Sequence, residues 1–176
     1  MRLSQWMLGL GLAALTTTGA HAATTVEMHA VSADGVGESI GTITAEKTSW
    51  GVEFTPDLKG LETGMHGFHL HQNPSCEPAE KDGETVAAAA AGGHFDPEET
   101  GTHQGPYGEG HLGDLPLLTA DAQGTSTTPV LAPRLTMDDL AGHALVIHAG
   151  GDNYSDDPHL GGGGARVACG VIETTQ

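Results

Sequence analysis

Two histidines separated by one residue, His69 and His71, form the first candidate metal-binding pair. In an extended strand, residues i and i+2 point to the same face about 6–7 Å apart, so both imidazoles can bind one ion. A His-x-His pair alone is weak evidence, because two surface histidines give the same pattern. His148 is a third candidate, because it follows the apolar run 145–147, where a polar side chain needs a partner.

A second set of possible ligands lies within 21 residues of the chain, in a segment where glycine and proline set the backbone. Three imidazoles and one carboxylate make a four-ligand set suited to tetrahedral zinc, and imidazole also suits copper. A polar loop with scattered histidines is the alternative, but the close spacing makes it a poor account. The set consists of His94, His103, His111 and Asp114.

Short alternating runs, with turn residues between them, predict the strands that would position these side chains. The runs are 25–32, 39–47, 51–55, 65–71, 144–148 and 166–172, and Asp34-Gly35 is a hairpin signal. Two longer segments, 72–116 and 150–164, lack strand character and hold most of the histidines. The sequence therefore predicts an all-β sandwich or barrel with long functional loops.

Two short segments have helical features. A Ser/Thr-x-x-Asp pattern at Thr136 resembles a helix cap and predicts a short helical piece within 133–140. The alanine-rich run 87–91 is either a helical turn or a spacer.

Other histidines call for ordinary explanations. His66 has the opposite strand parity to His69, so we expect a hydrogen-bonded structural residue rather than a ligand. His29, His143 and His159 have no clustered partners and are expected at the surface. Lys59 precedes the His-x-His segment and could add positive potential there, although a solvated lysine is the simpler account.

Two sequence segments resemble the signatures of copper/zinc superoxide dismutases. They are GMHGFHLH at 64–71 and GGGGARVACGVI at 161–172. The resemblance runs in order from about residue 24 to residue 172, and the segment HAGGDN at 148–153 resembles the bacterial, periplasmic branch. It implies an eight-stranded Greek-key β-barrel, a fold that belongs to the wider sandwich architecture.

The resemblance also implies a role for each candidate residue. Copper would be bound by His69, His71, His94 and His148, and zinc by His94, His103, His111 and Asp114, with His94 bridging the two metals.

Three further features follow from the resemblance. Arg166 would be the active-site arginine near copper, and Asp152 the carboxylate that links a copper-ligand histidine to a zinc-ligand histidine. Cys76 and Cys169 would form the disulfide within the chain.

The reaction implied is dismutation of superoxide to dioxygen and hydrogen peroxide by alternate reduction and oxidation of copper. His94 and Arg166 would be the catalytic residues, and zinc would be structural. The alternative is a copper/zinc buffer or chaperone-like module on the same fold, without turnover. Such a module need not keep Arg166 or all three non-bridging copper histidines. A purely structural sandwich would have no use for seven metal ligands.

The first 22 residues have the features of a signal peptide. Arg2 is the only charged residue before Glu27, the apolar stretch 6–15 is too short to span a bilayer, and Ala20-His21-Ala22 is a small-x-small cleavage site. We therefore expect a signal peptide at 1–22, a dismutase domain at 23–176 and a periplasmic location. The lack of a cysteine near the cleavage site argues against a lipid anchor.

Cysteine content and charge narrow the possibilities further. Two cysteines in an exported chain favour a disulfide, and two free buried thiols are the alternative.

The formal charge is −17, and loss of Arg2 leaves five basic against 23 acidic side chains, or −18. So acidic a chain is a poor partner for nucleic acid or an anionic membrane surface. The substrate implied, superoxide, is itself an anion, and the sequence leaves monomer and homodimer open.

Overall fold

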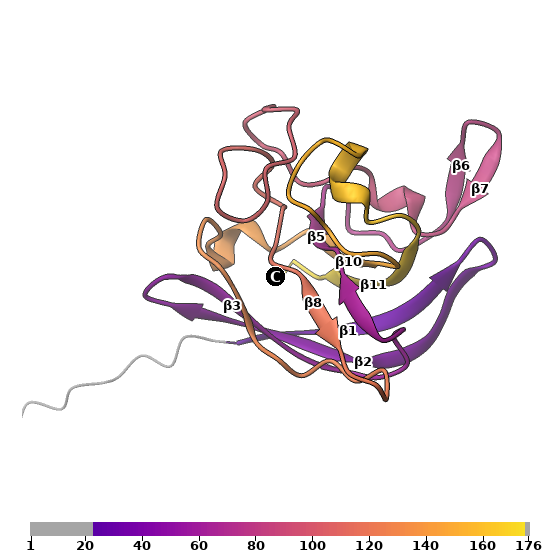
Figure 1. The fold of residues 1–176 in the computed structure, drawn as a ribbon, viewed down its shortest axis with the longest axis horizontal. Coiled ribbons are helices and arrows are strands. Elements are labelled where there is room, and N and C mark those ends of the chain that lie inside the picture. The colour runs from indigo at the N-terminus through magenta and orange to yellow at the C-terminus, as the bar shows by residue number, and fades with distance from the viewer. Residues whose placement is uncertain (1–22, 175–176) are drawn as a thin grey trace, which may run out of the picture.

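The computed structural model describes residues 23–174, which contain no α-helix. The predicted signal peptide at 1–22 lies outside the described residues. Seven strands form one strongly curled antiparallel sheet in the order β5-β10-β11-β1-β2-β3-β9 (Figure 1). In chain order these are β1 (Thr24–Ser32), β2 (Gly35–Thr48), β3 (Gly51–Leu58), β5 (Phe68–His71), β9 (Val130–Ala132), β10 (His143–His148) and β11 (Arg166–Ile172).

Two short strands complete the barrel. β4 (Gly64–His66) pairs with β8 (Leu118–Ala120) and continues into β5 after a break at Gly67. Counting β4 and β5 as one interrupted strand gives eight strands. Because the chain crosses from β3 to the opposite edge of the sheet and later returns to place β11 beside β1, the connectivity is that of a Greek key. The predicted fold class is confirmed.

A hairpin outside the barrel was not predicted. β6 (Ala79–Lys81) and β7 (Glu84–Val86) pair only with each other, and the hairpin projects from the barrel (Figure 1). It lies in the segment expected to be irregular. Its strands of three residues, like β8 and β9, are too short to show an alternating hydrophobic pattern.

Five of the six predicted strands are confirmed, with changes of up to four residues at their ends, and the sixth, 65–71, is two short strands broken at Gly67. The hairpin between β1 and β2 is also confirmed, although its turn residues are Ala33 and Asp34 and Gly35 already begins β2. The short helical piece predicted within 133–140 is confirmed as a single 3₁₀ turn, η2 (Met137–Asp139), and of the two alternatives for 87–91 the structure has the helical turn, η1 (Ala89–Ala91). Thr136 and Asp139 form a reciprocal capping box at η2, as the sequence pattern indicated.

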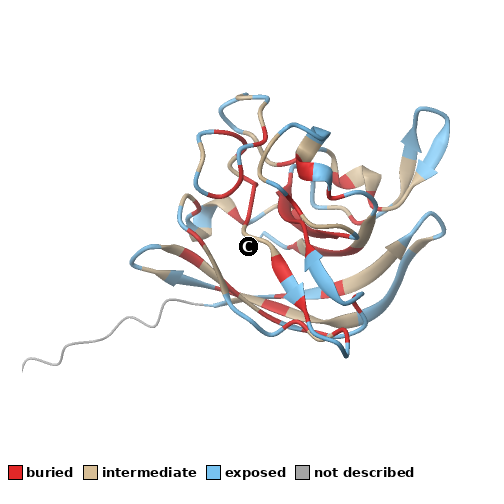
Figure 2. Cartoon of the chain, viewed as in Figure 1, coloured by how far each residue is buried: buried red, intermediate tan, exposed pale blue. Residues whose placement is uncertain are grey.

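Strands β5 and β10 are buried on both faces along almost their whole length, and the middle of β11 beside β10 is buried on both faces as well (Figure 2). On β3 only alternate side chains are buried, which is the pattern of a strand with one face in the core. On β5, Phe68 and Leu70 enter the core, where Phe68 meets Phe54 edge-on with 5.5 Å between ring centroids. The opposite face of β5 carries His69 and His71, and the long loops cover it.

The predicted disulfide joins Cys76 to Cys169, with 5.6 Å between their Cα atoms. It ties the segment after β5 to the middle of β11. The loop that contains η1 is therefore fastened to the strand that begins with Arg166.

Candidate metal centre

Four imidazoles converge above β5 and β10. His69 and His71 project from β5, and His148 is the last residue of β10, the strand paired with β5. His94 reaches them from the loop, through an isolated backbone bridge to His71. One ring nitrogen from each of the four lies within 4.8 Å of the others.

Three of these rings each keep one buried nitrogen without a hydrogen-bond partner. The unpaired atoms are Nδ1 of His69, Nε2 of His71 and Nε2 of His148. An unpaired buried polar atom costs free energy, so native structures rarely keep one without a purpose. Three unpaired ring nitrogens that lie close together fit the ligands of one metal ion.

The second nitrogen of each ring fixes which nitrogen stays free. Nε2 of His69 donates to Asp152 Oδ2 at 2.7 Å, Nδ1 of His71 to the Gly92 carbonyl at 3.0 Å, and Nδ1 of His148 to the Gly164 carbonyl at 3.2 Å. A neutral imidazole has one N–H and one lone pair. Each donated hydrogen bond therefore leaves the lone pair on the unpartnered nitrogen, which is how proteins orient histidine ligands.

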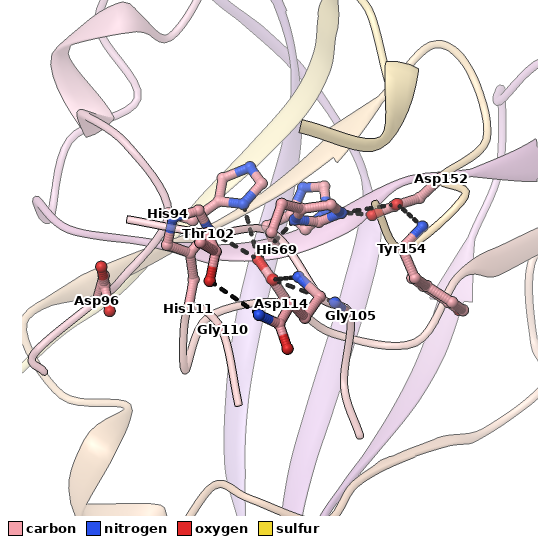
Figure 3. Close-up of polar contacts among 12 residues, drawn as sticks. His69, His94, Asp96, Thr102, Gly105, Gly110, His111, Asp114, Asp152 and Tyr154 are labelled. Carbon is pink, nitrogen blue, oxygen red and sulfur yellow. Dashed lines mark hydrogen bonds and ion pairs between the residues drawn. The ribbon is translucent and has the colours of Figure 1, made fainter. Parts of the chain in front are cut away.

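A second cluster surrounds one carboxylate oxygen. Asp114 Oδ1 lies 2.9 Å from Nδ1 of His94, 2.9 Å from Nδ1 of His103 and 3.3 Å from Nδ1 of His111 (Figure 3). A tetrahedral zinc with bonds of about 2.0–2.1 Å would separate its ligand atoms by about 3.3 Å. The observed separations are close to that spacing, so the four residues fit a tetrahedral ion.

Asp152 joins the two clusters. Its Oδ2 accepts from His69 Nε2 at 2.7 Å, and its Oδ1 accepts from His103 Nε2 at 2.8 Å and from the Tyr154 backbone N–H at 2.7 Å (Figure 3). Burial opposes ionisation of this carboxyl, but the hydrogen bonds from His103 and His69 outweigh it and hold its pKa below the usual range. One charged side chain thus orients a ring in each cluster.

Burial also sets the charge state of the first cluster. It lowers the pKa of His69 and His71 well below the usual value, and it lowers the pKa of His148 to about 4. Positive charge on His94 would lower all three further. These rings are therefore neutral at pH 7, which is the form that binds metal.

His103 behaves differently. Burial alone would lower its pKa, but hydrogen bonds and charge from Asp114 and Asp152 raise it to about 9. Hydrogen bonds from His103 and His94 hold the pKa of Asp114 far below its usual range, against the effect of burial. In the metal-free chain His103 is therefore protonated at neutral pH between two carboxylates, and a divalent cation bound there would replace that proton.

A model of the family described as copper/zinc superoxide dismutase matches residues 39–172. The chain belongs to the copper/zinc superoxide dismutase family. Superoxide dismutase [Cu-Zn] 2 of Salmonella typhimurium is 56% identical over 175 residues, which are 98% of this chain and 99% of that protein. Copper and zinc are the cofactors of this family, and the two clusters fit them.

Solved structures agree with that assignment. The copper/zinc superoxide dismutase from Brucella abortus matches with a TM-score of 0.85 at 50% identity, over 86% of this chain and all of that chain. The monomeric copper, zinc superoxide dismutase from Salmonella enterica matches with a TM-score of 0.78 at 58% identity, over the same shares.

Arg166 stands beside the first cluster in this dismutase fold. Its guanidinium donates to the carbonyl oxygens of Ala88 and Gly92, both at 2.6 Å. The Gly92 carbonyl also accepts from His71, so the arginine and a ring of the first cluster share one acceptor. Three of the five guanidinium N–H groups remain for other partners.

An open cavity of about 560 Å³ leads to this place. His94, His148 and Arg166 line it, together with Lys81 on the β6–β7 hairpin and His159. Sequence reasoning missed Lys81, because the hairpin that carries it was not predicted. His159 is exposed, as expected, but it lies at the mouth of the cavity rather than on an unrelated surface.

Two other residues are placed as follows. Lys59 is exposed and lines a separate hollow with Ser39 and Asp57, away from the cavity that contains Arg166. His66 is buried, and its two ring nitrogens lie 2.7 Å from the carbonyl oxygens of His148 and Glu62. The structural reading of His66 is confirmed. No helix in the part of the chain that the structure describes is long and apolar enough to cross a membrane.

Proposed function

We propose that this chain is a superoxide dismutase whose two metals are held by the two histidine clusters. One observation carries the proposal: two four-residue clusters of possible metal ligands share His94, and buried ring nitrogens without hydrogen-bond partners lie within them. Copper is assigned to His69, His71, His94 and His148. Zinc is assigned to His94, His103, His111 and Asp114.

When bound, copper supplies the one-electron chemistry, oxidising one superoxide to dioxygen and reducing a second, which takes up two protons to give hydrogen peroxide. Arg166 binds the anion, because its guanidinium stays charged and faces the cavity with free N–H groups. The Nδ1 atom of His94 lies 2.9 Å from Asp114 Oδ1, in the cluster assigned to zinc. We assign its Nε2 atom to the copper cluster, where a proton carried on Nε2 can pass to the reduced substrate. Asp152 holds His69 and His103 in their binding tautomers.

The alternative is a metal-binding module without turnover. Arg166, placed in an open cavity beside a complete first cluster, supports the enzyme, because a buffer needs neither an anion-binding group nor access for substrate.

The test is superoxide consumption, followed by pulse radiolysis or stopped flow. The protein loaded with copper and zinc should consume superoxide catalytically, and the protein loaded with zinc alone should not. His148→Gln should bind zinc normally and lose activity, because it removes a ligand from the copper set only. Loaded protein that bound both metals in these sites and consumed no superoxide would leave the buffer as the better account.

We further propose that residues 1–22 direct export to the periplasm and are removed after Ala22. The disulfide supports this, because such bonds persist in oxidising compartments. Sequencing the N-terminus of protein released by osmotic shock should give Ala23 as the first residue. An uncleaved chain that stayed with the cytoplasmic fraction would contradict the proposal.

We propose a monomer in solution. The relative from Salmonella enterica, which is described as monomeric, supports this at 58% identity. Light scattering coupled to gel filtration should give the mass of one chain, and a mass of two chains would establish the homodimer instead.

A further inference from the structure

Arg134 lies between β9 and η2, 23 residues after His111 in the chain, and it contacts the loop that carries the second cluster. Its Nη2 donates to the Gly110 carbonyl at 2.6 Å and its Nη1 to the His111 carbonyl at 3.1 Å. The side chain is half-buried and lines a small hollow with Asp96, Glu98 and Gly110. Among the described residues no carboxylate lies within ion-pair distance of it.

The contacted backbone belongs to the least enclosed ligand of the second cluster. His111 is 9% exposed, against 1% for His103 and 2% for Asp114. The distance from its Nδ1 to Asp114 Oδ1, 3.3 Å, is also the longest of the three. Of the four ligands, His111 therefore has the most need of a support from outside the cluster.

Few other contacts hold this piece of backbone. The His111 N–H donates to the Thr102 carbonyl at 2.9 Å, within the same irregular loop. Gly110 packs so closely against that carbonyl that a Cβ on Gly110 would clash with it. The His111 carbonyl also accepts the Asp114 N–H at 3.3 Å. All three contacts stay within the loop, whereas Arg134 ties the backbone of Gly110 and His111 to the segment after β9; the next tie to the barrel is at Gly113, whose carbonyl accepts the Leu70 N–H of β5 at 2.9 Å.

We propose that Arg134 is a positioning residue for the zinc site. A planar guanidinium that donates to the carbonyl oxygens of Gly110 and His111 fixes the orientation of the two peptides that flank the Cα of His111. This fixes the direction in which the His111 side chain leaves the backbone, and so holds Nδ1 toward Asp114. The inference rests on the proposed assignment of His111 to zinc.

The requirement is for a fork of donors and not for charge alone. A lysine at this position would keep the charge but act as a single point donor, so it would hold one carbonyl at a time. Arg134→Lys should therefore retain part of the effect. Arg134→Met keeps an unbranched stem for packing and removes both donors. Lys59→Met, which removes a charge from the separate hollow, is the matched control.

The experiment measures zinc binding directly, with zinc alone added to the metal-free protein. Removing a group that orients a metal ligand typically costs about 10–100-fold in metal affinity. Transfer of zinc to a chromophoric chelator should show weaker binding and faster release in Arg134→Met, a smaller change in Arg134→Lys, and wild-type behaviour in Lys59→Met. The thermal midpoint of the metal-free protein should stay near the wild-type value, while the rise on adding zinc should shrink.

Two results would overturn the inference. One is zinc release at the wild-type rate from both Arg134 variants. The other is a lowered midpoint of the metal-free protein with an undiminished rise on adding zinc, because that pattern describes general stability. If Arg134→Met does not fold, the zinc release rate of Arg134→Lys is the test: faster release than wild type supports the inference, and release at the wild-type rate overturns it. The His111→Ala variant separates the two proposals. If it binds zinc as tightly as wild type, the assignment of His111 to zinc is wrong. If it binds zinc weakly while both Arg134 variants bind zinc like wild type, only the proposed role of Arg134 is refuted.

Discussion

At the scale of single residues, this centre is built from side chains that use one atom for orientation and another for binding. His69, His71 and His148 each donate from one nitrogen to a fixed oxygen and leave the other unpaired. The orienting oxygens are as important to the geometry as the nitrogens, because they decide the tautomer. Only one of them, on Asp152, belongs to a side chain.

Asp152→Asn tests this dependence on a single carboxylate. An asparagine keeps one acceptor oxygen and replaces the other with a donor, so it cannot accept from both His69 and His103. We expect affinity for both metals to fall by about 10–100-fold. Competition with chelators checks this, with Asp57→Asn on an exposed part of β3 as the control. Loss of one metal's affinity alone would mean that Asp152 orients only one of the two rings.

Arg166 supports a prediction about rate. The substrate is an anion and the whole chain carries −17, so attraction has to arise locally. Charges beyond a Debye length of about 8 Å are largely screened at physiological salt, and a fixed guanidinium in the cavity acts within that range. Arg166→Ala should lower the second-order rate constant with both metals bound, and Arg166→Glu should lower it further. An unchanged rate for Arg166→Glu at low salt, with copper and zinc confirmed by elemental analysis, would contradict this role.

At the scale of elements, the two clusters have different supports. Three rings of the first cluster stand on β5 and β10, which are hydrogen-bonded neighbours with matched register. The second cluster lies on an irregular loop, where backbone N–H groups of Gln104 and Gly105 hold Asp114, and Arg134 holds the carbonyls beside His111. The ladder fixes most of the first cluster, whereas the second depends on these polar contacts and on a backbone bridge from Asp114 to His69 of β5.

The disulfide supports a prediction at this scale. Cys76–Cys169 ties the loop to β11, close to the carbonyls that hold Arg166. Removing a native disulfide of this kind typically costs about 2–5 kcal/mol. Denaturant unfolding of the Cys76→Ser/Cys169→Ser variant should show a loss of that size. A free energy of unfolding equal to that of wild type would mean that the bond adds nothing to the folded chain.

The strands and the parity of His69 and His71 could be predicted from the sequence, because alternation along a strand is visible in the order of residues. The candidate ligands could be predicted from their types and spacing together with the family signatures. Lys81 in the cavity and Arg134 under the loop could not. Lys81 lies on a hairpin too short to leave a pattern, and Arg134 acts on carbonyl oxygens, which every residue carries and no sequence distinguishes.

At the scale of the whole molecule, the metal-free chain keeps several buried histidines neutral at pH 7, and this makes it sensitive to acid. The pKa of His148 is about 4 in the folded chain, and those of His69 and His71 are also lowered, against about 6.5 when unfolded. Their contribution to stability is present above pH of about 6.5 and is lost as the pH falls toward the folded values, because the unfolded chain then binds more protons. His103, with a pKa of about 9, has the opposite sign and loses its contribution as the pH rises from about 6.5 to 9.

We therefore expect the free energy of unfolding of the metal-free protein to be greatest near neutral pH. Below pH of about 6.5 it should fall by up to about 1.4 kcal/mol per pH unit for each neutral histidine. Urea titrations between pH 4 and pH 9 check this. The metal-loaded protein is the comparison, and its slope should be at least as steep, because bound metal keeps the ligand nitrogens unprotonated in the folded chain while the unfolded chain still takes up protons. A free energy of unfolding of the metal-free protein that did not fall between pH 6.5 and pH 4 would refute the account.

The placement of three first-cluster rings on β5 and β10 also bears on electron transfer. The Cα positions of His69 and His71 cannot shift without breaking the ladder between β5 and β10, His148 follows directly after that ladder, and the core packed beneath resists deformation. A centre framed in this way has little to rearrange when its charge changes, which keeps the reorganisation energy small. The stiffness of the barrel would then speed the reaction, because neither the reduction nor the oxidation of the centre would require the protein to rearrange.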